Sequence, residues 1–394
     1  MGHSRAFSEP GVMKIKIQSL SSARLVLIAS GLALSLFASC ETLQYRPEAI
    51  GPEGEIMVVI DSLNWDGPVG EALRENLGPL IGTLPAPEPL FNLRRVSITS
   101  EAFLKTIQKQ KNIVFVAPLN DNTPEASFIR SRLDEAGLES ILNGRNAVID
   151  RRDLWRRYQQ VYYLMSATPE GIAQLLEENG EGLRYKFNEI ARVRTTRELF
   201  KKGRQPEIEQ RLLRDHGFAV NAQYDYQIAI DTTNFVWLRR IVSSNSWRSL
   251  FVYYVDNASP NSLTPEWIYE ARERLTENWI TGNKGGFVAI DYRRELKTEN
   301  IDFLGRYGYE TRGLWHMVGV DENGDRFDYG GGGAFVNYAF FDEPTQRIYL
   351  IDGMIFAPKY SKREFLRHME ATAYTFRTQE DEDSWAQKKA QAGL

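Results

Sequence analysis

The sequence predicts an α+β protein of two pseudo-repeated units of mainly antiparallel sheet with helices on one face, joined by a helical connector. Two observations predict this class. Short apolar runs typical of strands are separated by segments that carry the start signals of helices. Several of these motifs then recur in the second half of the chain, in the same order as in the first.

The recurrence favours an internal duplication in which each unit runs β-β-β-α-β-β-α. Residues 60–65 (IDSLNW) resemble residues 230–235 (IDTTNF). The motif Thr-Pro-Glu occurs at Thr123 and Thr264, and the strand ends Asp150 and Asp291 share its offset of 141 residues. The alternative is convergence, in which both halves use the same common strand and helix-cap motifs, because Thr-Pro-Glu is a frequent helix start.

Local signals place the elements of the first unit. Residues 112–118 form a continuous apolar run, as in a strand buried on both faces. Thr168-Pro169-Glu170 begins a helix well, because Thr caps, Pro suits the first helical position and Glu favours the positive helix end. The other expected elements are strands at 55–61, 91–98, 147–150 and 160–165, helices starting at 69 and 124, and a proline-rich loop at 83–89.

The second unit carries extra residues that the first lacks. Within them, residues 318–327 predict a hairpin around an Asn-Gly turn. Further on, Ser361 and Glu364 have capping-box spacing and predict the start of a helix. The expected divisions are a signal peptide over 1–39 with Met13 the true start, a lipidated tether over 40–54, a first repeat over 55–184, a helical connector over 185–217, a second repeat over 218–376 with an insertion over 297–346, and a disordered tail over 377–394.

The N-terminal segment indicates a lipid anchor. Basic residues precede an apolar run that is shorter than the roughly 20 residues a membrane span needs. The run ends at Phe37-Ala38-Ser39-Cys40, which is similar to a bacterial lipobox, and Cys40 is the only cysteine of the chain. We therefore expect Cys40 to carry palmitate and to attach the protein to the outer membrane, on either its periplasmic or its surface side. The alternative is an ordinary secretory signal with an incidental cysteine.

The composition limits which kinds of partner, metal and cofactor we expect. The 394 residues have a formal net charge of −4, so nothing in the charge indicates nucleic-acid binding. None of the four histidines has a second His or Cys at metal-ligand spacing, and no nucleotide-binding or nucleophile motif is present. We expect no metal and no cofactor; the expected partners are the membrane, through the anchor, and an envelope protein.

Two pairs of residues are candidates for acid–base chemistry. Asp150 and Asp291 end equivalent strands of the two repeats, where paired carboxylates would meet at a shared cleft. His316 with Asp321 is another candidate pair. The simpler interpretation is that each aspartate pairs with its neighbouring arginine.

The insertion supplies the candidates for binding. Its glycine run would cradle an anion on backbone N–H groups, or would serve a flexible loop or a close backbone approach. The candidate binding residues are Trp315, Gly330, Gly331, Gly332, Gly333 and Tyr338.

Several segments resemble an uncharacterised family of Bacteroidota envelope lipoproteins that is catalogued as a domain of unknown function. They are residues 46–51 (RPEAIG), the strand ending at Asp61 with Trp65 after it, residues 84–91 (LPAPEPLF) and residues 111–114 (KNIV). The resemblance covers most of the mature chain. It implies an envelope lipoprotein, and the family offers no catalytic residues to carry over.

Three functions are compatible with these observations. The first is a non-enzymatic envelope lipoprotein that binds a partner or belongs to an assembly. The second is an envelope hydrolase that acts on glycan or peptide through paired carboxylates. The third is a carrier of a small ligand, which requires an aromatic-lined cavity.

Overall fold

The computed structural model describes residues 46–243, 246–282 and 285–391. All the helices and strands described below lie within Glu48–Leu394. The predicted signal peptide and Cys40 lie outside the described residues.

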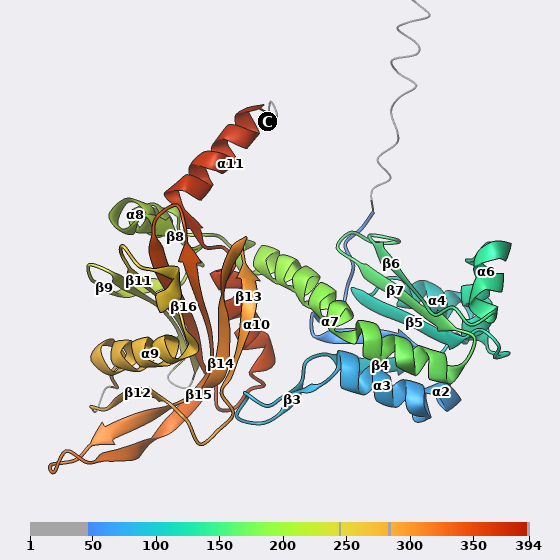
Figure 1. Ribbon diagram of the computed structural model, residues 1–394, viewed down its shortest axis with the longest axis horizontal. Helices are drawn as coiled ribbons and strands as arrows, with labels where there is room; N and C mark the ends of the chain where they lie inside the picture. The colour runs from blue at the N-terminus through green and yellow to red at the C-terminus, as the bar shows by residue number, and fades with distance from the viewer. Residues whose placement is uncertain (1–45, 244–245, 283–284, 392–394) are drawn as a thin grey trace, which may run out of the picture. The chain divides into compact units, whose positions relative to one another are not determined.

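The first sheet has five strands in the order β4-β1-β5-β7-β6 (Figure 1). β1, β4, β5 and β7 are parallel, and β6 alone runs antiparallel to its neighbour β7. Every residue of β5 and β7 is buried, as expected for strands covered on both faces. The bounds are β1 Glu55–Val59, β4 Asn92–Val96, β5 Asn112–Pro118, β6 Ala147–Arg152 and β7 Gln160–Ser166.

Helices cover both faces of this sheet (Figure 1). On one face, α3 and α7 bury Leu73, Leu176 and Phe187 against the strands. On the other face, α5 and α6 bury Ile129 and Ile141. The bounds are α2 Ser62–Asp66, α3 Pro68–Leu77, α4 Glu101–Ile107, α5 Pro124–Arg130, α6 Glu135–Leu142 and α7 Pro169–Phe200, with a small hairpin of β2 Leu80–Ile81 and β3 Glu88–Pro89.

The second sheet has eight strands and is antiparallel throughout. Its order is β12-β14-β15-β16-β11-β10-β9, and β13 pairs with the first part of β14. The bounds are β9 Gln227–Asp231, β10 Phe235–Ser243, β11 Ser246–Val255, β12 Phe287–Ile290, β13 Lys297–Phe303, β14 Arg306–Val320, β15 Arg326–Asp342 and β16 Arg347–Phe356.

Both faces of the second sheet are also covered. Leu212 of α8 and Met369 of α10 pack on one face, and Ile268 and Leu275 of α9 pack on the other. The remaining bounds are α8 Pro206–His216, α9 Pro265–Trp279, α10 Arg363–Ala373, α11 Gln379–Gln391, the 3₁₀ turn Pro260–Ser262, and a two-stranded pair of β8 Phe218–Ala219 and β17 Arg377–Thr378.

The α+β class is confirmed, and a helix, α7, joins two sheet-bearing regions. The duplication is wrong, because the first sheet is mainly parallel and the second is antiparallel. The reason is that helix α3 lies between β1 and β4, and helix α4 between β4 and β5, so each crossover brings the chain back to start the next strand in the same direction. Helix α4 was not predicted. The prediction that helices cover one face of each sheet is also wrong, since both faces of both sheets are covered.

Three helices begin at the threonine N-caps that the sequence predicted. The Thr123, Thr168 and Thr264 hydroxyls accept hydrogen bonds from the backbone N–H groups of Ala126, Gly171 and Trp267. These three predicted N-caps are confirmed. The helix that starts after Thr168 continues to Phe200, so it already includes much of the expected connector.

Two expectations near the C-terminus are wrong. The Ser361 capping box does not form; instead the Glu88 carboxylate accepts hydrogen bonds from the Lys362 and Arg363 N–H groups, at 2.6 and 3.2 Å. The tail from Arg377 is ordered as β17 and α11. Arg377 pairs with Glu209 and Glu382, which accounts for the order.

Candidate functional site

The two candidate aspartates do not form a carboxylate pair. Asp150 lies on β6, where it accepts hydrogen bonds from the Gln160 amide at 2.6 Å and the Tyr162 hydroxyl at 3.3 Å. Asp291 follows β12 of the other sheet and accepts from the Arg293 guanidinium at 2.7 and 3.0 Å. The simpler interpretation, pairing with a local arginine, therefore holds for Asp291 but not for Asp150.

Asp291 belongs to a cluster that we call the Asp-Arg-His cluster, made of Asp291, Arg293, His316 and Asp328. Arg293 Nη2 donates to both Asp291 and Asp328, at 3.0 Å each. His316 Nδ1 lies 3.5 Å from Asp328 Oδ2 and 3.5 Å from Arg293 Nη2. The guanidinium thus bridges two carboxylates beside an imidazole.

Strand pairing assembles this cluster. Residue Ala289 of β12 pairs with His316 of β14, and the Asp291 N–H donates to the Leu314 carbonyl at 2.8 Å. On the other side of β14, Val318 pairs with Asp328 of β15. Three segments that are distant in sequence therefore meet at one end of the sheet.

His316 does not pair with Asp321, contrary to the prediction. Asp321 sits in the turn of the β14–β15 hairpin, where its side chain accepts the N–H groups of Asn323 and Asp325 at 2.9 and 2.8 Å. The predicted hairpin is confirmed, and Asp321 serves its turn.

The glycine run has a backbone explanation. Gly330 and Gly331 have φ of +82° and +93° at a register shift in β15, a conformation that favours glycine. A Cβ on Gly332 would lie 2.5 Å from the Trp315 carbonyl oxygen, and one on Gly333 would lie 1.9 Å from the Ile355 carbonyl oxygen. Of the predicted roles, the close backbone approach is the one observed.

The electrostatics keep the two carboxylates of the cluster ionised. Hydrogen bonds from Arg293 hold the pKa of Asp291 below its usual range. The Gly330 N–H and then Arg293 lower the pKa of Asp328. A general acid in glycoside hydrolysis needs a raised carboxyl pKa, so neither aspartate has the property required.

The two aromatic candidates are core residues. Trp315 is 2% exposed, stacks on Trp247 with ring centroids 5.3 Å apart, and donates from Nε1 to the Ile355 carbonyl at 3.3 Å. Tyr338 is 1% exposed, and burial raises its pKa well above the ordinary value. Neither side chain is available to a partner at the surface.

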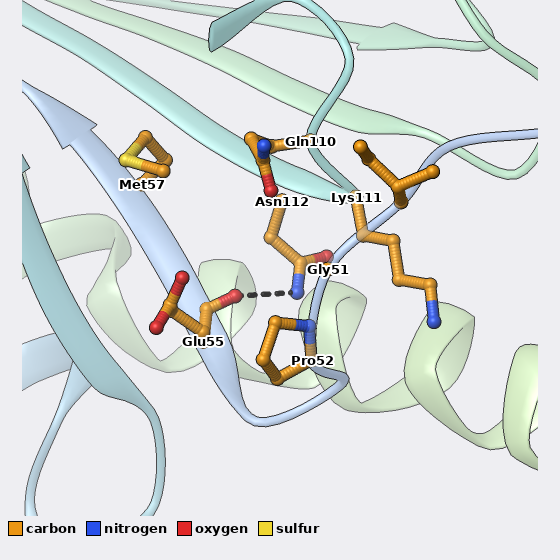
Figure 2. Close-up of a pocket in the computed structure, with 8 residues that line it drawn as sticks. Gly51, Pro52, Glu55, Met57, Gln110, Lys111 and Asn112 are labelled. Carbon is orange, nitrogen blue, oxygen red and sulfur yellow. Dashed lines mark hydrogen bonds between the residues drawn. The ribbon is translucent and has the colours of Figure 1, made fainter. Parts of the chain in front are cut away.

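A shallow depression beside Gly51 and Pro52 is filled by the chain's own contacts. Figure 2 shows the Asn112 side-chain amide reaching β1, where it donates to the Glu55 carbonyl at 2.9 Å. Arg194 donates to the Asn112 side chain at 2.7 Å. The depression has an internal volume of about 0 Å³, so it offers no room for a ligand.

The sequence reasoning missed an open strand edge. Residues 335–340 of β15 pair with both β14 and β16, whereas among the described strands residues 326–328 and 332–334 pair with β14 alone. We call residues 318–328 the hairpin arm; Figure 1 shows it at the far end of β14 and β15. Val320 and Phe327 on this arm are 52% and 47% exposed.

These features define an α+β chain with a parallel-type sheet in one region and an antiparallel sheet in the other. Residues 49–200 match a domain of unknown function (DUF8532), and residues 205–375 match another domain of unknown function (DUF4837). The predicted resemblance to proteins catalogued in this way is confirmed. Two different models match the two regions, which agrees with their different topologies.

Other comparisons add little. No curated protein matches the chain. The Ran-binding protein Mog1p of Saccharomyces cerevisiae is similar at 12% identity, with a TM-score of 0.27, over 41% of this chain and 90% of that one. A mutant of the protein Mog1 gives 13% identity and a TM-score of 0.25, with the same two shares. Likenesses this remote carry no argument about function.

Two further findings concern the described residues only. None of their helices is long and apolar enough to span a bilayer. No group of three or more His, Cys, Asp or Glu side chains among them is arranged to hold a metal ion.

Proposed function

We propose that this chain is a lipid-anchored protein of the bacterial cell envelope, held at the outer membrane, where it binds a partner protein as a component of an assembly. The basic segment, the apolar run and the small residues before the solitary Cys40 support the anchor. The tether over 41–54 spans at most about 50 Å, so the body stays near the bilayer.

The observation that carries the binding proposal is the open edge of the hairpin arm. An unpaired strand edge presents a row of N–H and C=O groups that an extended segment of another protein can pair with. Val320 and Phe327 add exposed apolar surface on the same arm. We propose that the partner contributes an extended segment to this edge.

The hydrolase alternative receives less support. Asp150 and Asp291 have separate hydrogen-bond partners on different sheets. Asp291 and Asp328 are ion-paired to Arg293, and both have a lowered pKa.

The anchor is tested by metabolic labelling with an alkyne analogue of palmitate. The wild-type chain takes up label and sediments with membranes, whereas Cys40→Ala does neither. Label that persists in Cys40→Ala contradicts the anchor without bearing on the hairpin arm.

The partner is tested by photo-crosslinking in cells from a probe at Val320. We expect one repeated crosslinked protein, lost when Phe327→Lys places a charge on the edge. A probe at Ile241, which is 61% exposed on the same sheet, is the positional control, and Ile241→Lys is the matched charge control. Equal crosslinking from both positions, or a strictly monomeric protein without an enriched neighbour, contradicts the proposal.

A further inference from the structure

The first sheet-bearing region contains a cavity of about 220 Å³ on the face that carries α5 and α6. Its wall comes from five segments: α5, the residues after it, β6, the residues after β6, and β7. Most of the lining is apolar and comes from Ile129, Leu133, Ile149, Leu154, Trp155 and Met165.

The polar groups at this cavity carry positive charge. Arg132 and Arg151 line it, and neither has a carboxylate within ion-pair distance among the described residues. Arg132 lies over the Phe128 ring at 4.8 Å, and Arg151 donates to the backbone oxygen of Asp150 at 2.8 Å. Within the described part of the chain, two guanidinium groups therefore stand at a mostly apolar cavity without a carboxylate partner.

The nearest carboxylate on β6 faces the other way. Side chains alternate along a strand, so Ile149 and Arg151 reach this face while Asp150 contacts Tyr162 on the opposite face. The sheet itself thus separates the Asp150 carboxylate from the cavity.

A tyrosine completes the lining. Tyr163 is 6% exposed as a whole residue, and among the described residues its hydroxyl has no hydrogen-bond partner. Burial raises the pKa of Tyr163 to about 12, and the charged groups that act against this are Arg132 and Arg151. The phenol therefore remains a neutral hydrogen-bond donor at the cavity.

Aromatic rings form one side of the cavity. Tyr163 stacks on Phe115 with centroids 5.1 Å apart, and Trp155 meets Phe115 edge-on at 6.1 Å. Benzene fills a cavity of about 150 Å³, so this volume accommodates a single ring with a short substituent.

We infer that this cavity binds a small monoanionic amphiphile with a ring-sized apolar body, such as an arylalkyl carboxylate. The body packs against Trp155 and Met165. The carboxylate meets Arg132 and Arg151 and accepts a hydrogen bond from the Tyr163 hydroxyl. This site is separate from the hairpin arm and does not depend on the proposed partner.

The test is calorimetric titration of the purified full chain with phenylacetate. The neutral isostere phenylacetamide tests the need for charge, hexanoate tests a ring against an alkyl body, and inorganic phosphate tests a bare anion. We expect phenylacetate to bind at least tenfold more tightly than phenylacetamide and phosphate. Binding of hexanoate equal to that of phenylacetate contradicts the ring-sized body.

Variants locate the site. Arg132→Met and Arg151→Met should each weaken phenylacetate about tenfold and leave phenylacetamide unchanged, and Tyr163→Phe should weaken it a fewfold. Arg145→Met is the matched control, because Arg145 is exposed, precedes β6 by two residues and does not line the cavity. Unchanged circular dichroism and melting temperature establish that each variant folds; a variant that does not fold is replaced by the Lys substitution, which retains the charge and should retain binding. Absence of binding at millimolar phenylacetate, or equal weakening by Arg145→Met, overturns the inference.

Discussion

At the scale of single residues, a buried ion pair joins α9 to β16 of the second sheet, and in the described part of the chain Arg272 Nη1 and Nη2 and Asp352 Oδ1 have no hydrogen-bond partner. Arg272 Nε donates to Asp352 Oδ2 at 2.8 Å, and both residues are 0% exposed. Asn337 donates to the same oxygen at 3.1 Å, and the Arg272 guanidinium lies 3.7 Å over the Phe335 ring. Burial raises the pKa of Asp352, so the carboxylate depends on Arg272 to remain charged.

Arg272→Met should therefore lower the free energy of unfolding by about 3–5 kcal/mol, because it leaves a buried carboxylate without its counter-ion. Urea unfolding followed by circular dichroism measures the change. Adding Asp352→Asn should restore part of the loss. The control is Arg274→Met on the exposed side of α9; a similar loss there would show that the buried charge is not the cause.

His368 predicts a pH dependence of stability. Burial, and then Arg248 and Arg240, lower its pKa to about 4 in the folded chain. In the unfolded chain the pKa is about 6.5, so below that pH the unfolded state binds a proton that the folded state does not. The free energy of unfolding should fall as pH decreases from about 6.5 to about 4, and this group should have no effect above that window.

His368→Asn removes this contribution, because an asparagine side chain does not titrate in this pH range. Its amide oxygen can still accept a hydrogen bond from Arg248, whose guanidinium lies 3.0 Å from His368 Nδ1. Urea unfolding at pH 7, 6 and 5 compares the two proteins. The wild type should lose more stability than the variant on acidification. Parallel curves for the two proteins would rule out His368 as the source.

At the scale of elements, helix α10 begins with a cap supplied by a residue 274 positions away. The Glu88 carboxylate accepts the Lys362 and Arg363 N–H groups, which are unsatisfied inside the helix. The negative charge also favours the positive end of the helix dipole. β3 and α10 are thereby linked through the Glu88 side chain, and Arg363 Nη1 adds a hydrogen bond to the Pro89 carbonyl at 2.6 Å.

Glu88→Gln should lower the free energy of unfolding by about 1 kcal/mol, since it removes the charge at this cap. Ser361→Ala is the control, because Ser361 makes no capping hydrogen bond, and its effect should stay within a few tenths of a kcal/mol. Thermal and urea unfolding measure both. A larger loss for Ser361→Ala would favour the capping box read from the sequence.

The glycine run gives a second prediction at this scale. Gly333→Ala places a Cβ against the Ile355 backbone and should cost about 2–3 kcal/mol, because backbone must shift. Gly182→Ala, in the interior of α7 with no atom within 4 Å of the added Cβ, should raise stability by about 0.5–1 kcal/mol. Unfolding in urea separates the two, and equal effects would contradict the close approach.

At the scale of the whole molecule, the C-terminal segment belongs to the fold. Arg306 pairs with Asp342 and, at 2.7 Å, with Asp381 of α11. The Thr378 N–H also donates to Asp381 at 2.8 Å. α11 is therefore attached to the second sheet through its first turn.

A chain ended after Thr378 should lose about 1–2 kcal/mol of unfolding free energy, because Arg306 and Arg377 each lose a carboxylate partner. A chain ended after Lys388 keeps these contacts and should match the full chain. Melting temperature and hydrogen exchange at β17 report the change. Identical stability of the two truncated chains would indicate that the tail makes no contribution.

A feature could be predicted from the sequence where it depends on residues that are close together in the chain. β5 was predicted at its observed bounds because its apolar run is continuous, and Thr123 caps a helix through neighbours three residues away. Strand direction was not predictable, since a strand pattern does not state which way its neighbour runs. The sequence singled out Asp291 and His316, but Arg293 and Asp328 join them only through the pairing of three strands.

The sequence by itself determined where the strands of the first sheet and several helices begin, which segments are apolar, and that a solitary cysteine follows a signal-like run. Those properties depend on residues within a few positions of one another. Only the tertiary structure decided the parallel first sheet, the Glu88 cap, the ordered tail and the cavity at Tyr163. Each of these depends on contacts between residues far apart in the chain, and folding selects such contacts by burial and hydrogen bonding summed over the molecule.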